Sequence, residues 1–473
     1  MDMQRSVAVL LLALGAGCAS DVELELDREA EASSSIGALR SARVFAGSGD
    51  LRVMGLAWHP TSLVVVGGEF SGTTDLGTGP VSHDAYRAGF VGAYDAATGA
   101  PVWTRVFAGS VASDVSYHLT HSGVMDLAVA VDGTVLAAGG FGRTVDFGTG
   151  PVESTDGCSD GMVARYSADG DPLEPFILPK SQLYAVAAMP DGGLVTCGYE
   201  VVAECPWLDG GNAPVQGFVA RLAPTGEVLW KHHIGSEANA DAVATTAAGD
   251  VLVHGVFSGR AAIGDIALDD GPGSDMFIAR LSADGRPRWL RGCTAESLES
   301  SCTHDAGFAI GGDRVFMVAN ATGEVAFAGQ QIPAVGPFER MFLAELGDAG
   351  DAQILMVSDA AVGRSIAVHA EPFEVVVSGD GNADSDAAGP YVGILAEGAS
   401  LVSQRGMSIS PYGSGQAWDV AVGPAGELAV VGAFHGAADF GDGPVRAETD
   451  EHDEGDDGFL AIYDRDVVVE SVR

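Results

Sequence analysis

The chain has 473 residues, of which 47% are hydrophobic, and its formal net charge at pH 7 is −41. This apolar content is enough to build a core and excludes wholesale disorder. Nucleic-acid binding needs a cationic surface, and an anionic membrane surface would repel this chain, so we expect neither as a direct partner. The 66 glycines predict many turns between short strands.

The N-terminus has the features of an export signal. Arg5 precedes an apolar run from Val7 to Leu14, and small residues then lead to Cys18. A cysteine directly after small residues resembles the bacterial lipoprotein signal, and this resemblance implies that Cys18 becomes the lipidated first residue of the mature chain. That family prefers Leu three residues before the cysteine, where this chain has Gly15. The alternative is an ordinary secretory signal with an incidental cysteine.

We therefore expect a lipoprotein-type signal peptide over residues 1–18 and a tether over residues 19–40. The second stretch is acidic, contains serines and has no core pattern, as is typical of a solvated linker. No later stretch reaches the roughly 18 apolar residues of a membrane helix, so we expect membrane contact only through the lipid anchor. These features predict an exported lipoprotein of the outer membrane or cell surface.

The remaining chain, residues 41–473, repeats one pattern seven times. Each unit has a short apolar strand, a tight polar turn, an apolar run ending in glycine, a longer loop and a third strand. The strings "VMDLAVAVDG", "VLAAGGFGR" and "DGMVARYSADG" form one such unit, and most units close with a fourth strand. Seven units stacked radially bury both faces of each sheet and leave few exposed edges. The sequence therefore predicts an all-β fold, a seven-bladed β-propeller with four-stranded antiparallel blades.

The order of these repeats resembles the bacterial β-propeller repeat family of secreted and lipoprotein chains. In that family an unpaired strand at one end of the chain often joins the blade at the other end. "RVFAGS" at residues 43–48 recurs at residues 105–110, where it is the fourth strand of the first unit. We predict that Val44–Ala46 pairs beside the last blade. "VVVESVR" at residues 467–473 competes for the outermost position, and the sequence leaves this choice open.

The loops divide into two sets. Turns between the first and second and between the third and fourth strands share one side of the ring, here called the short-turn face. Second-to-third loops and blade-to-blade links share the other side, here called the long-loop face. Long loops on a rigid frame commonly carry binding residues, so we expect a protein or glycan ligand on the long-loop face of a monomer, near the central channel. The alternative is that these loops are tolerated insertions.

One recurring string resembles a phosphate loop. "VDFGTGPV" at residues 145–152 returns in the first and last units as "TDLGTGPV" and "ADFGDGPV", whereas blades three to six depart from it. A phosphate loop leads from a strand into a helix, but these strings lie between two strands. We interpret them as a blade-loop signature in which Gly148 and Gly150 supply turn conformations and Phe147 covers a blade edge.

Five cysteines lie beyond the signal peptide, and an exported chain permits disulfides. Cys293 and Cys302 flank the link between blades 4 and 5, so a bridge between them would close a short loop. Cys205 can bridge either Cys158 or Cys197, which leaves one thiol over. A lone cysteine in a core strand, such as Cys197, is usually a small buried hydrophobe.

Two histidine pairs are weak metal candidates. His118 and His121 lie three apart in a link, but such spacing forms a site only when further ligands converge, so we interpret this segment as a polar loop. His232 and His233 are adjacent on a strand and are expected to point to opposite faces. No cysteine spacing indicates zinc, and we expect no metal site.

Two further strings invite functional assignments. From Asp380 onward, "DGNADSDAAGPY" spaces acidic side chains as a calcium loop does, but Ser385 and Tyr391 stand where that loop needs Gly and Glu. "DAATGAPVW" and "APTGEVLW" resemble the repeats of quinone-dependent dehydrogenase propellers, in which Trp packs between blades. This chain has no adjacent cysteine pair, and we interpret Trp103 and Trp230 as inter-blade packing.

No motif pairs a nucleophile with a base, and no carboxylate pair stands out from the acidic background. We therefore expect no catalytic residue and no cofactor. The sequence predicts a cell-envelope lipoprotein whose non-catalytic propeller is a binding or scaffold module. One alternative is a propeller enzyme (a lyase, a hydrolase or a quinone-dependent dehydrogenase), which a cluster of His, Arg and carboxylates at the channel mouth would favour. The other is a calcium-stabilised surface adhesin.

Overall fold

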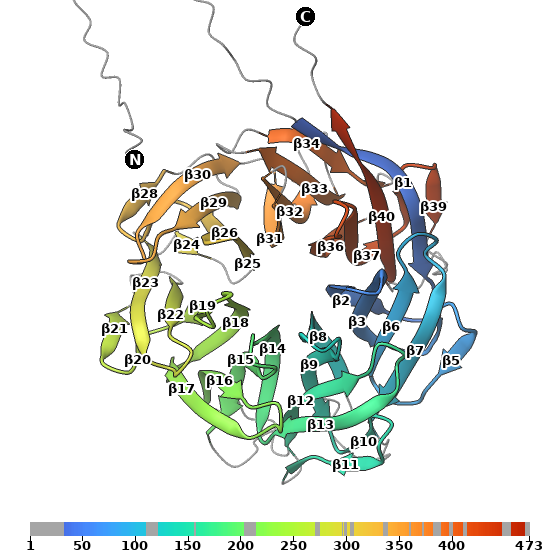
Figure 1. The fold of residues 1–473 in the computed structure, drawn as a ribbon, viewed down its shortest axis with the longest axis horizontal. Helices are drawn as coiled ribbons and strands as arrows, with labels where there is room; N and C mark the ends of the chain where they lie inside the picture. The colour runs from blue at the N-terminus through green and yellow to red at the C-terminus, as the bar shows by residue number, and fades with distance from the viewer. Residues whose placement is uncertain are drawn as a thin grey trace, which may run out of the picture.

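The protein is a ring of seven antiparallel blades around one axis (Figure 1). The computed structural model describes residues 33–109, 122–155, 158–202, 214–269, 275–295, 297, 300–302, 307–333, 339–358, 361–370, 373–381, 389–396, 401–409, 414–446 and 456–468. The regular elements of these residues are all β-strands. The predicted all-β, seven-bladed propeller with four-stranded blades is thereby confirmed.

In the first three blades the strands run in chain order from the axis outward. Blade 1 contains β2 (Leu51–His59), β3 (Leu63–Phe70), β6 (Ala88–Asp95) and β7 (Pro101–Ala108). Blade 2 contains β8 (Ser122–Val129), β9 (Val135–Gly142), β12 (Ser159–Tyr166) and β13 (Pro172–Leu178). Blade 3 contains β14 (Ser181–Ala188), β15 (Leu194–Val201), β16 (Val215–Leu222) and β17 (Val228–Ser236).

The next three blades keep this order. Blade 4 contains β18 (Ala238–Thr245), β19 (Val251–Phe257), β22 (Asp275–Leu281) and β23 (Pro287–Ala295). Blade 5 contains β25 (Gly307–Gly311), β26 (Arg314–Thr322), β29 (Arg340–Leu346) and β30 (Ala352–Ser358), and β24 (Ser301–Cys302) also pairs with β26. Blade 6 contains β31 (Ala361–His369), β32 (Glu374–Gly381), β33 (Gly389–Ala396) and β34 (Leu401–Gly406).

The last blade combines both ends of the chain. Its strands from the axis outward are β36 (Ser414–Val422), β37 (Leu428–His435), β40 (Asp457–Val468) and β1 (Ser33–Phe45). Val44 pairs with Phe459 in the antiparallel ladder between β1 and β40, which confirms the predicted pairing of the N-terminal segment beside the last blade. The ring is therefore closed by a strand from the opposite end of the chain, which lies outside β40 in Figure 1.

Two expectations about the chain ends need correction. β1 begins at Ser33, so residues 33–40, which we expected in the tether, belong to the propeller. They find ladder partners because β40 continues beyond Tyr463, the last of its residues that pairs with β37. Val467 and Val468 extend this third strand and pair with β1, so they do not form a fourth strand of their own. The expected signal peptide, residues 19–32 and residues 469–473 lie outside the described residues.

Within the residues that the structure describes, five second-to-third loops fold as small hairpins. They are β4 (Thr73–Asp75) with β5 (Pro80–Ser82), β10 (Thr144–Asp146) with β11 (Pro151–Glu153), β20 (Arg260–Ile263) with β21 (Ile266–Asp269), β27 (Val325–Phe327) with β28 (Gln330–Ile332), and β38 (Ala437–Asp439) with β39 (Pro444–Arg446). Two of them add to a neighbouring segment, because β27 pairs with the outer strand of blade 4 and β38 pairs with β35 (Ser408–Ile409), which follows the outer strand of blade 6. Hairpins of this kind therefore connect consecutive blades.

The hydrophobic core is divided among the blade interfaces, because successive side chains of a strand point to opposite faces of the sheet. In β3, Val64 and Val66 pack in the cluster shared with the last blade, whereas Val65 packs in the cluster shared with blade 2. All three side chains are fully buried. Each blade thus buries two faces, which no blade could do alone.

Tryptophans of three outer strands fill the interfaces near the short-turn face. Trp103, Trp230 and Trp289 each donate an Nε1–H hydrogen bond to a carbonyl in the third-to-fourth turn of the next blade, at 2.9, 2.9 and 3.0 Å. A glycine of that same turn packs against each ring, as Gly170 does against Trp103. The interpretation of the tryptophans as inter-blade packing is confirmed.

Candidate functional site

In the string that resembles a phosphate loop, the backbone N–H groups bind an aspartate of the same turn. Asp146 Oδ1 accepts hydrogen bonds from the backbone N–H groups of Gly148 and Gly150, at 2.7 and 3.0 Å. The same two contacts recur at Asp75 in blade 1 and at Asp439 in the last blade. The amide pair that would bind a phosphate oxygen is therefore occupied from within the turn.

The apolar residue of this string anchors its hairpin on the preceding blade. The ring of Phe147 lies 5.2 Å from that of Phe107 in the outer strand of blade 1 and 5.4 Å from that of Phe141 in its own blade. Blades 4 and 5 depart from the signature in sequence but form the same kind of hairpin, in which Ile263 and Phe327 are buried. The signature is therefore an architectural device, and these two departures preserve it.

Two aspartates lie on innermost strands, which surround the axis of the ring, and bond to neighbouring blades. Asp126 in β8 accepts hydrogen bonds from the backbone N–H of Leu127 and, in the next blade, from that of Val186, both at 2.8 Å. Asp419 in β36 accepts at 2.8 Å from the backbone N–H of Leu56, which lies in blade 1. Each aspartate thus caps the free edge of the next blade's innermost strand.

Asp419 also reaches backward to the preceding blade. Its Oδ1 accepts a 2.6 Å hydrogen bond from the hydroxyl of Ser365 in β31 and a 2.8 Å bond from its own neighbour, the backbone N–H of Val420. One carboxylate therefore connects three consecutive blades. The β-bulges beside Asp126 and Asp419, where the ladder register shifts by one residue, aim these side chains across the interface.

Enclosure changes the acidity of both groups. Burial raises the pKa of Asp126 to about 7, and the nearby charge of Asp419 adds to this rise. Burial likewise raises the pKa of Asp419 to about 6, although its hydrogen bonds from Ser365 and the backbone oppose the shift. Sequence reasoning missed this pair. The available signal was a single Asp inside an otherwise apolar innermost strand, in "VMDLAVAV" and "AWDVAV".

Next to Ser365 and Asp419 on strands β31 and β36, an arginine stacks on a tryptophan. The guanidinium of Arg364 in β31 lies 4.5 Å from the ring of Trp418 in β36. Its Nε and Nη2 donate to Asp380 Oδ2 at 2.9 and 2.8 Å. Asp380, the first residue of the string that resembles a calcium loop, therefore pairs with an arginine. Residues 382–388 of that string lie outside the described residues.

A second group of charges lies where the last blade meets blade 1, on the long-loop side. Arg87 forms ion pairs with Asp50 at 2.7 Å and with Glu69 at 2.8 Å. Burial alone would raise the pKa of Asp50, but the backbone N–H of Asp456 and the guanidinium of Arg87 outweigh it and lower that pKa. These contacts hold the first innermost strand to the last blade.

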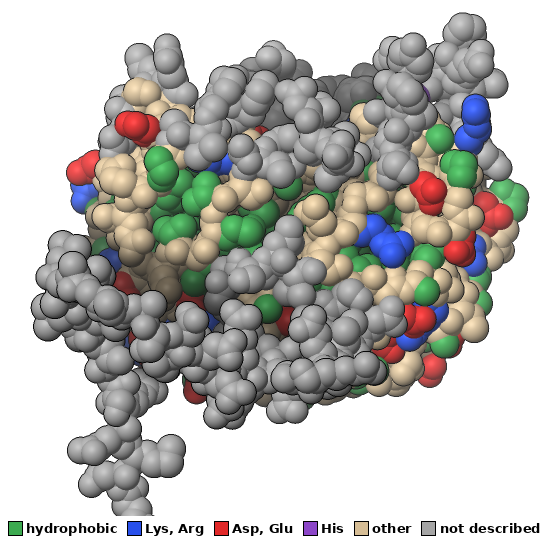
Figure 2. Space-filling model, turned by 90° about the horizontal axis from the view of Figure 1, so that it is seen from above, with side chains coloured by type: hydrophobic (Ala, Val, Ile, Leu, Met, Phe, Trp, Pro, Cys, Tyr) green, Lys and Arg blue, Asp and Glu red, His purple; other side chains and the backbone are tan. Residues whose placement is uncertain are grey.

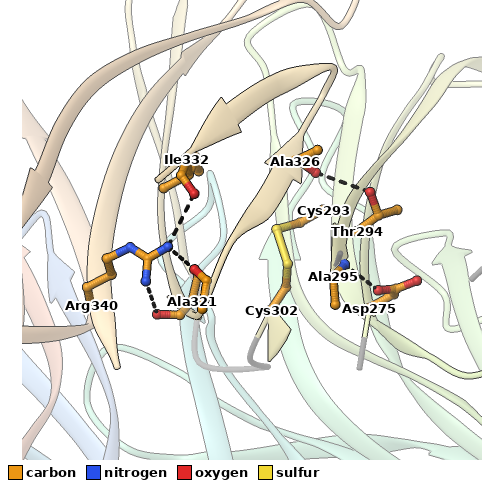
Figure 3. Close-up of a disulfide and its surroundings, with 10 residues drawn as sticks. Asp275, Cys293, Thr294, Ala295, Cys302, Ala321, Ala326, Ile332 and Arg340 are labelled. Carbon is orange, nitrogen blue, oxygen red and sulfur yellow. Dashed lines mark hydrogen bonds between the residues drawn. A yellow bond between two sulfur atoms is a disulfide. The ribbon is translucent and has the colours of Figure 1, made fainter. Parts of the chain in front are cut away.

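The disulfide between Cys293 and Cys302 joins the outer strand of blade 4 to β24, which pairs within blade 5 (Figure 3). Beside it, the buried guanidinium of Arg340 donates hydrogen bonds to the carbonyls of Ala321 and Ile332, at 3.5 and 3.3 Å. The bridge and the arginine therefore secure the hairpin that spans the two blades.

The other cysteines can be assigned in part. Cys158 is buried and disulfide-bonded. Cys205, its predicted partner, and Cys18, the predicted lipidation site, lie outside the described residues. Cys197 is a free thiol, so it is not the partner of Cys205. Burial of this thiol raises its pKa.

The histidine pairs do not form a metal site in the described part of the chain. His232 Nε2 bonds to the carbonyl of Gly285 in the next blade at 2.7 Å, whereas His233 Nε2 approaches Glu200 of its own blade at 3.2 Å. The two rings therefore point apart, as predicted. His118 and His121 lie outside the described residues. Among the residues that are described, no three His, Cys, Asp or Glu side chains are grouped to hold a metal ion.

Within the described residues there is no helix long and apolar enough to cross a membrane.

Comparison with known proteins found solved structures of low similarity only. No protein-family model and no curated protein sequence matches the chain. Similar solved structures include the Dos1 propeller (11% identity, 91% of this chain and 94% of that chain, TM-score 0.45) and the WD40 domain of Neurospora crassa Pan2 (8% identity, 92% and 100%, TM-score 0.45). A quinohemoprotein alcohol dehydrogenase from Pseudomonas putida is also similar (12% identity, 91% and 78%, TM-score 0.42). At these identities and TM-scores the similarities carry no argument for a shared activity.

Proposed function

We propose that this protein is an exported, lipid-anchored propeller that acts as a non-catalytic binding or scaffold module. The small residues before Cys18 support the anchor, and the closed ring supplies a rigid frame for loops. The proposed ligand is a protein or a glycan on the long-loop face of a monomer. The net charge of −41 disfavours nucleic acid.

The course of β1 supports an orientation for the anchored ring. Ser33 pairs with Val468, at the end of β40 that passes beyond the short-turn face. The 15 residue steps from Cys18 to Ser33 reach at most about 50 Å. A lipid at Cys18 would therefore attach the ring through its short-turn side, and in the proposed orientation the long-loop face is presented to partners.

The contacts of the axial aspartates carry the non-catalytic part of the proposal. The two oxygens of Asp126 accept backbone N–H groups of two blades, and those of Asp419 accept groups from three. Carboxylates used in this way hold a ring together. The aspartates inside the hairpin turns likewise accept backbone N–H groups, but those groups belong to their own turn.

Fractionation of cells that express the full chain tests the anchor. We expect the wild-type protein in the membrane fraction, with a lipid-modified N-terminal Cys18, and the Cys18→Ala variant in the soluble fraction. Cys197→Ala is the matched control and should remain with the membrane. A wild-type protein whose N-terminal peptide is unmodified would refute lipid anchoring.

Labelling of variants with one added cysteine tests the orientation, because the free thiol of Cys197 is buried. Ser82 in the first hairpin, on the long-loop side, and Ser62 in a short turn are both exposed. On intact membranes, a bulky membrane-impermeant maleimide should react faster with Ser82→Cys than with Ser62→Cys, and detergent should abolish the difference. Equal rates before detergent would refute the proposed presentation of the long-loop face.

An enzyme is the second candidate, because a carboxyl group with a pKa near 7, such as that of Asp126, suits proton transfer at neutral pH. A screen of ester and glycoside substrates would separate the two functions. Turnover by the wild type that Asp126→Asn abolishes, in a variant that still folds, would favour a hydrolase over the binding module.

A further inference from the structure

One blade interface has a pocket where others have an indole ring. In the strand ladders, Trp230 pairs with Arg221 and Trp289 pairs with Arg280, each the next-to-last residue of a third strand. In blade 5 the corresponding third-strand residue is Glu345, and it pairs with Gln353. A glutamine therefore stands in the ladder position that tryptophan holds in blades 3 and 4.

The missing ring coincides with open space. A pocket with a volume of about 180 Å³ lies between blades 5 and 6 near the short-turn face, and Gln353 is part of its lining. Most of its lining is apolar and includes the side chains of Phe316, Leu343, Leu355, Phe373, Val375 and Leu395. Part of β30 remains half-exposed at the rim of the ring. Figure 2, which looks onto the part of the rim that is uppermost in Figure 1, shows hydrophobic side chains at the surface there.

A second interface provides an internal comparison. The outer strand of blade 2 carries Leu173 opposite Arg165, so this interface also lacks the tryptophan. There the guanidinium of Arg165 lies 4.2 Å from the ring of Phe176, and the remaining pocket has a volume of only about 20 Å³. Phe176 also packs against Gly226 in the third-to-fourth turn of the next blade, as the tryptophans pack against theirs. The interface between blades 5 and 6 therefore keeps more open space than an interface in which a phenylalanine ring takes the place of the indole.

The polar groups of the pocket lie together on one side. Arg314 Nε and Nη2 donate to the two carboxylate oxygens of Glu345 at 2.8 and 2.9 Å. The guanidinium also lies over the rings of Phe316 and Phe373, at 4.8 and 4.3 Å from their centres. This geometry fixes the Glu345 carboxylate beside apolar walls, where its remaining lone pairs can accept from an N–H or O–H donor.

We propose that this pocket binds a small aromatic molecule of the size of indole that carries an N–H or O–H donor. Its volume exceeds the roughly 150 Å³ of an apolar cavity that is known to accept benzene. The tryptophan-filled interfaces show that this part of a blade junction accommodates an indole whose N–H is hydrogen-bonded. The site is separate from the ligand proposed for the long-loop face, because it opens on the opposite side of the ring.

Fluorine NMR with 5-fluoroindole tests the proposal on the full chain. We expect the wild type to broaden and shift the probe signal, with a Kd in the range of roughly 0.1–1 mM for a ligand of this size. Gln353→Trp places an indole into the pocket from within, so it should weaken binding at least tenfold and should not lower the melting temperature. Gln353→Ala, which leaves the pocket open, should bind as the wild type does.

Two further measurements keep the test decisive. Val375→Phe narrows the pocket from blade 6 and should weaken binding as Gln353→Trp does, so it decides the matter if the tryptophan variant fails to fold. 5-Fluoro-1-methylindole, which lacks the donor, should bind at least fivefold more weakly. Absence of binding to the wild type at millimolar probe, or equal binding by both pocket-filling variants, would overturn the proposal. Equal binding of the methylated probe would overturn the role of the donor.

Discussion

The backbone N–H of Leu56 donates a 2.8 Å hydrogen bond to Asp419 Oδ2, although the two residues are 363 positions apart in the sequence. This bond closes the ring at its axis, between the last innermost strand and the first. At the outer edge, the ladder between β1 and β40 closes the same ring. The propeller is therefore sealed at both its inner and its outer circumference.

Replacement of Asp419 by alanine should destabilise the closed ring. The variant leaves the N–H of Leu56 and the hydroxyl of Ser365 without their acceptor in an enclosed region. We expect the free energy of unfolding to fall by about 2–3 kcal/mol, the cost of leaving buried donors unsatisfied. Urea unfolding measures the loss. Asp442→Ala, in an exposed hairpin turn, is the control and should change stability by less than about 0.5 kcal/mol. Equal midpoints for both variants would show that the axial contact contributes nothing.

Stability should depend on pH through Asp126. Its pKa rises from 3.8 to about 7 on folding, so between these values the folded state keeps a proton that the unfolded state releases. The stabilising contribution is complete below about pH 4 and declines as the pH rises to about 7. We expect the stability advantage of the wild type over Asp126→Asn to shrink, by on the order of 2 kcal/mol, between pH 5 and pH 8.

The variant comparison is needed because His83 acts in the opposite direction. Burial lowers its pKa from 6.5, so its contribution grows as the pH rises through that range. Both proteins contain this histidine, and its effect cancels in their difference. Melting curves at four pH values measure the difference, and a gap that stays constant from pH 5 to pH 8 would contradict the raised pKa of Asp126.

Much of the fold was predictable because its signals are local. Seven repeats of apolar strands and turns indicate seven units, and the duplicated "RVFAGS" identifies a strand that belongs to another blade. The start of β1 was not predictable, because Ile36 and Leu39 are the only large apolar residues between Ser33 and Arg40. That segment becomes a strand because the long β40 offers it a ladder partner.

The candidate sites depend on register, which the sequence does not display. A β-bulge decides that Asp419 points across the interface. In blade 4, Trp289 lies four residues after the turn glycine, Gly285. In blade 5 the residue four positions after the turn glycine is Ile354, so the sequence alone would place an isoleucine at the tryptophan position. The ladder pairs Gln353 with Glu345 instead. A shift of one residue, invisible in the sequence, thus moves a different side chain into the pocket.

Alanine substitutions at two glycines distinguish the energetic cost of a clash with a tryptophan ring from the cost of backbone strain alone. Gly170 and Gly259 both have a φ of 80°. A Cβ on Gly170 would lie 2.5 Å from the Trp103 ring, whereas one on Gly259 would meet nothing within 4 Å. Gly259→Ala should cost about 1–2 kcal/mol from the backbone conformation alone. We expect Gly170→Ala to cost at least about 2 kcal/mol more, because it forces the indole out of its position. Equal losses in thermal unfolding would show that the tryptophan contact is loose.

Ring closure at the outer edge depends on Phe45, near the end of β1. Its side chain is fully buried, and its ring lies 6.4 Å from that of Phe90 and 5.5 Å from that of Tyr94, both in blade 1. Phe45→Ala should lower the free energy of unfolding by about 3–5 kcal/mol, because it opens a cavity where β1 joins the last blade to the first. Val102→Ala, at a side chain that is 53% exposed on another outer strand, should have an effect below about 0.5 kcal/mol. If denaturant unfolding gave the two variants the same midpoint, β1 would be an appendage and the ring would be closed by its axial contacts alone.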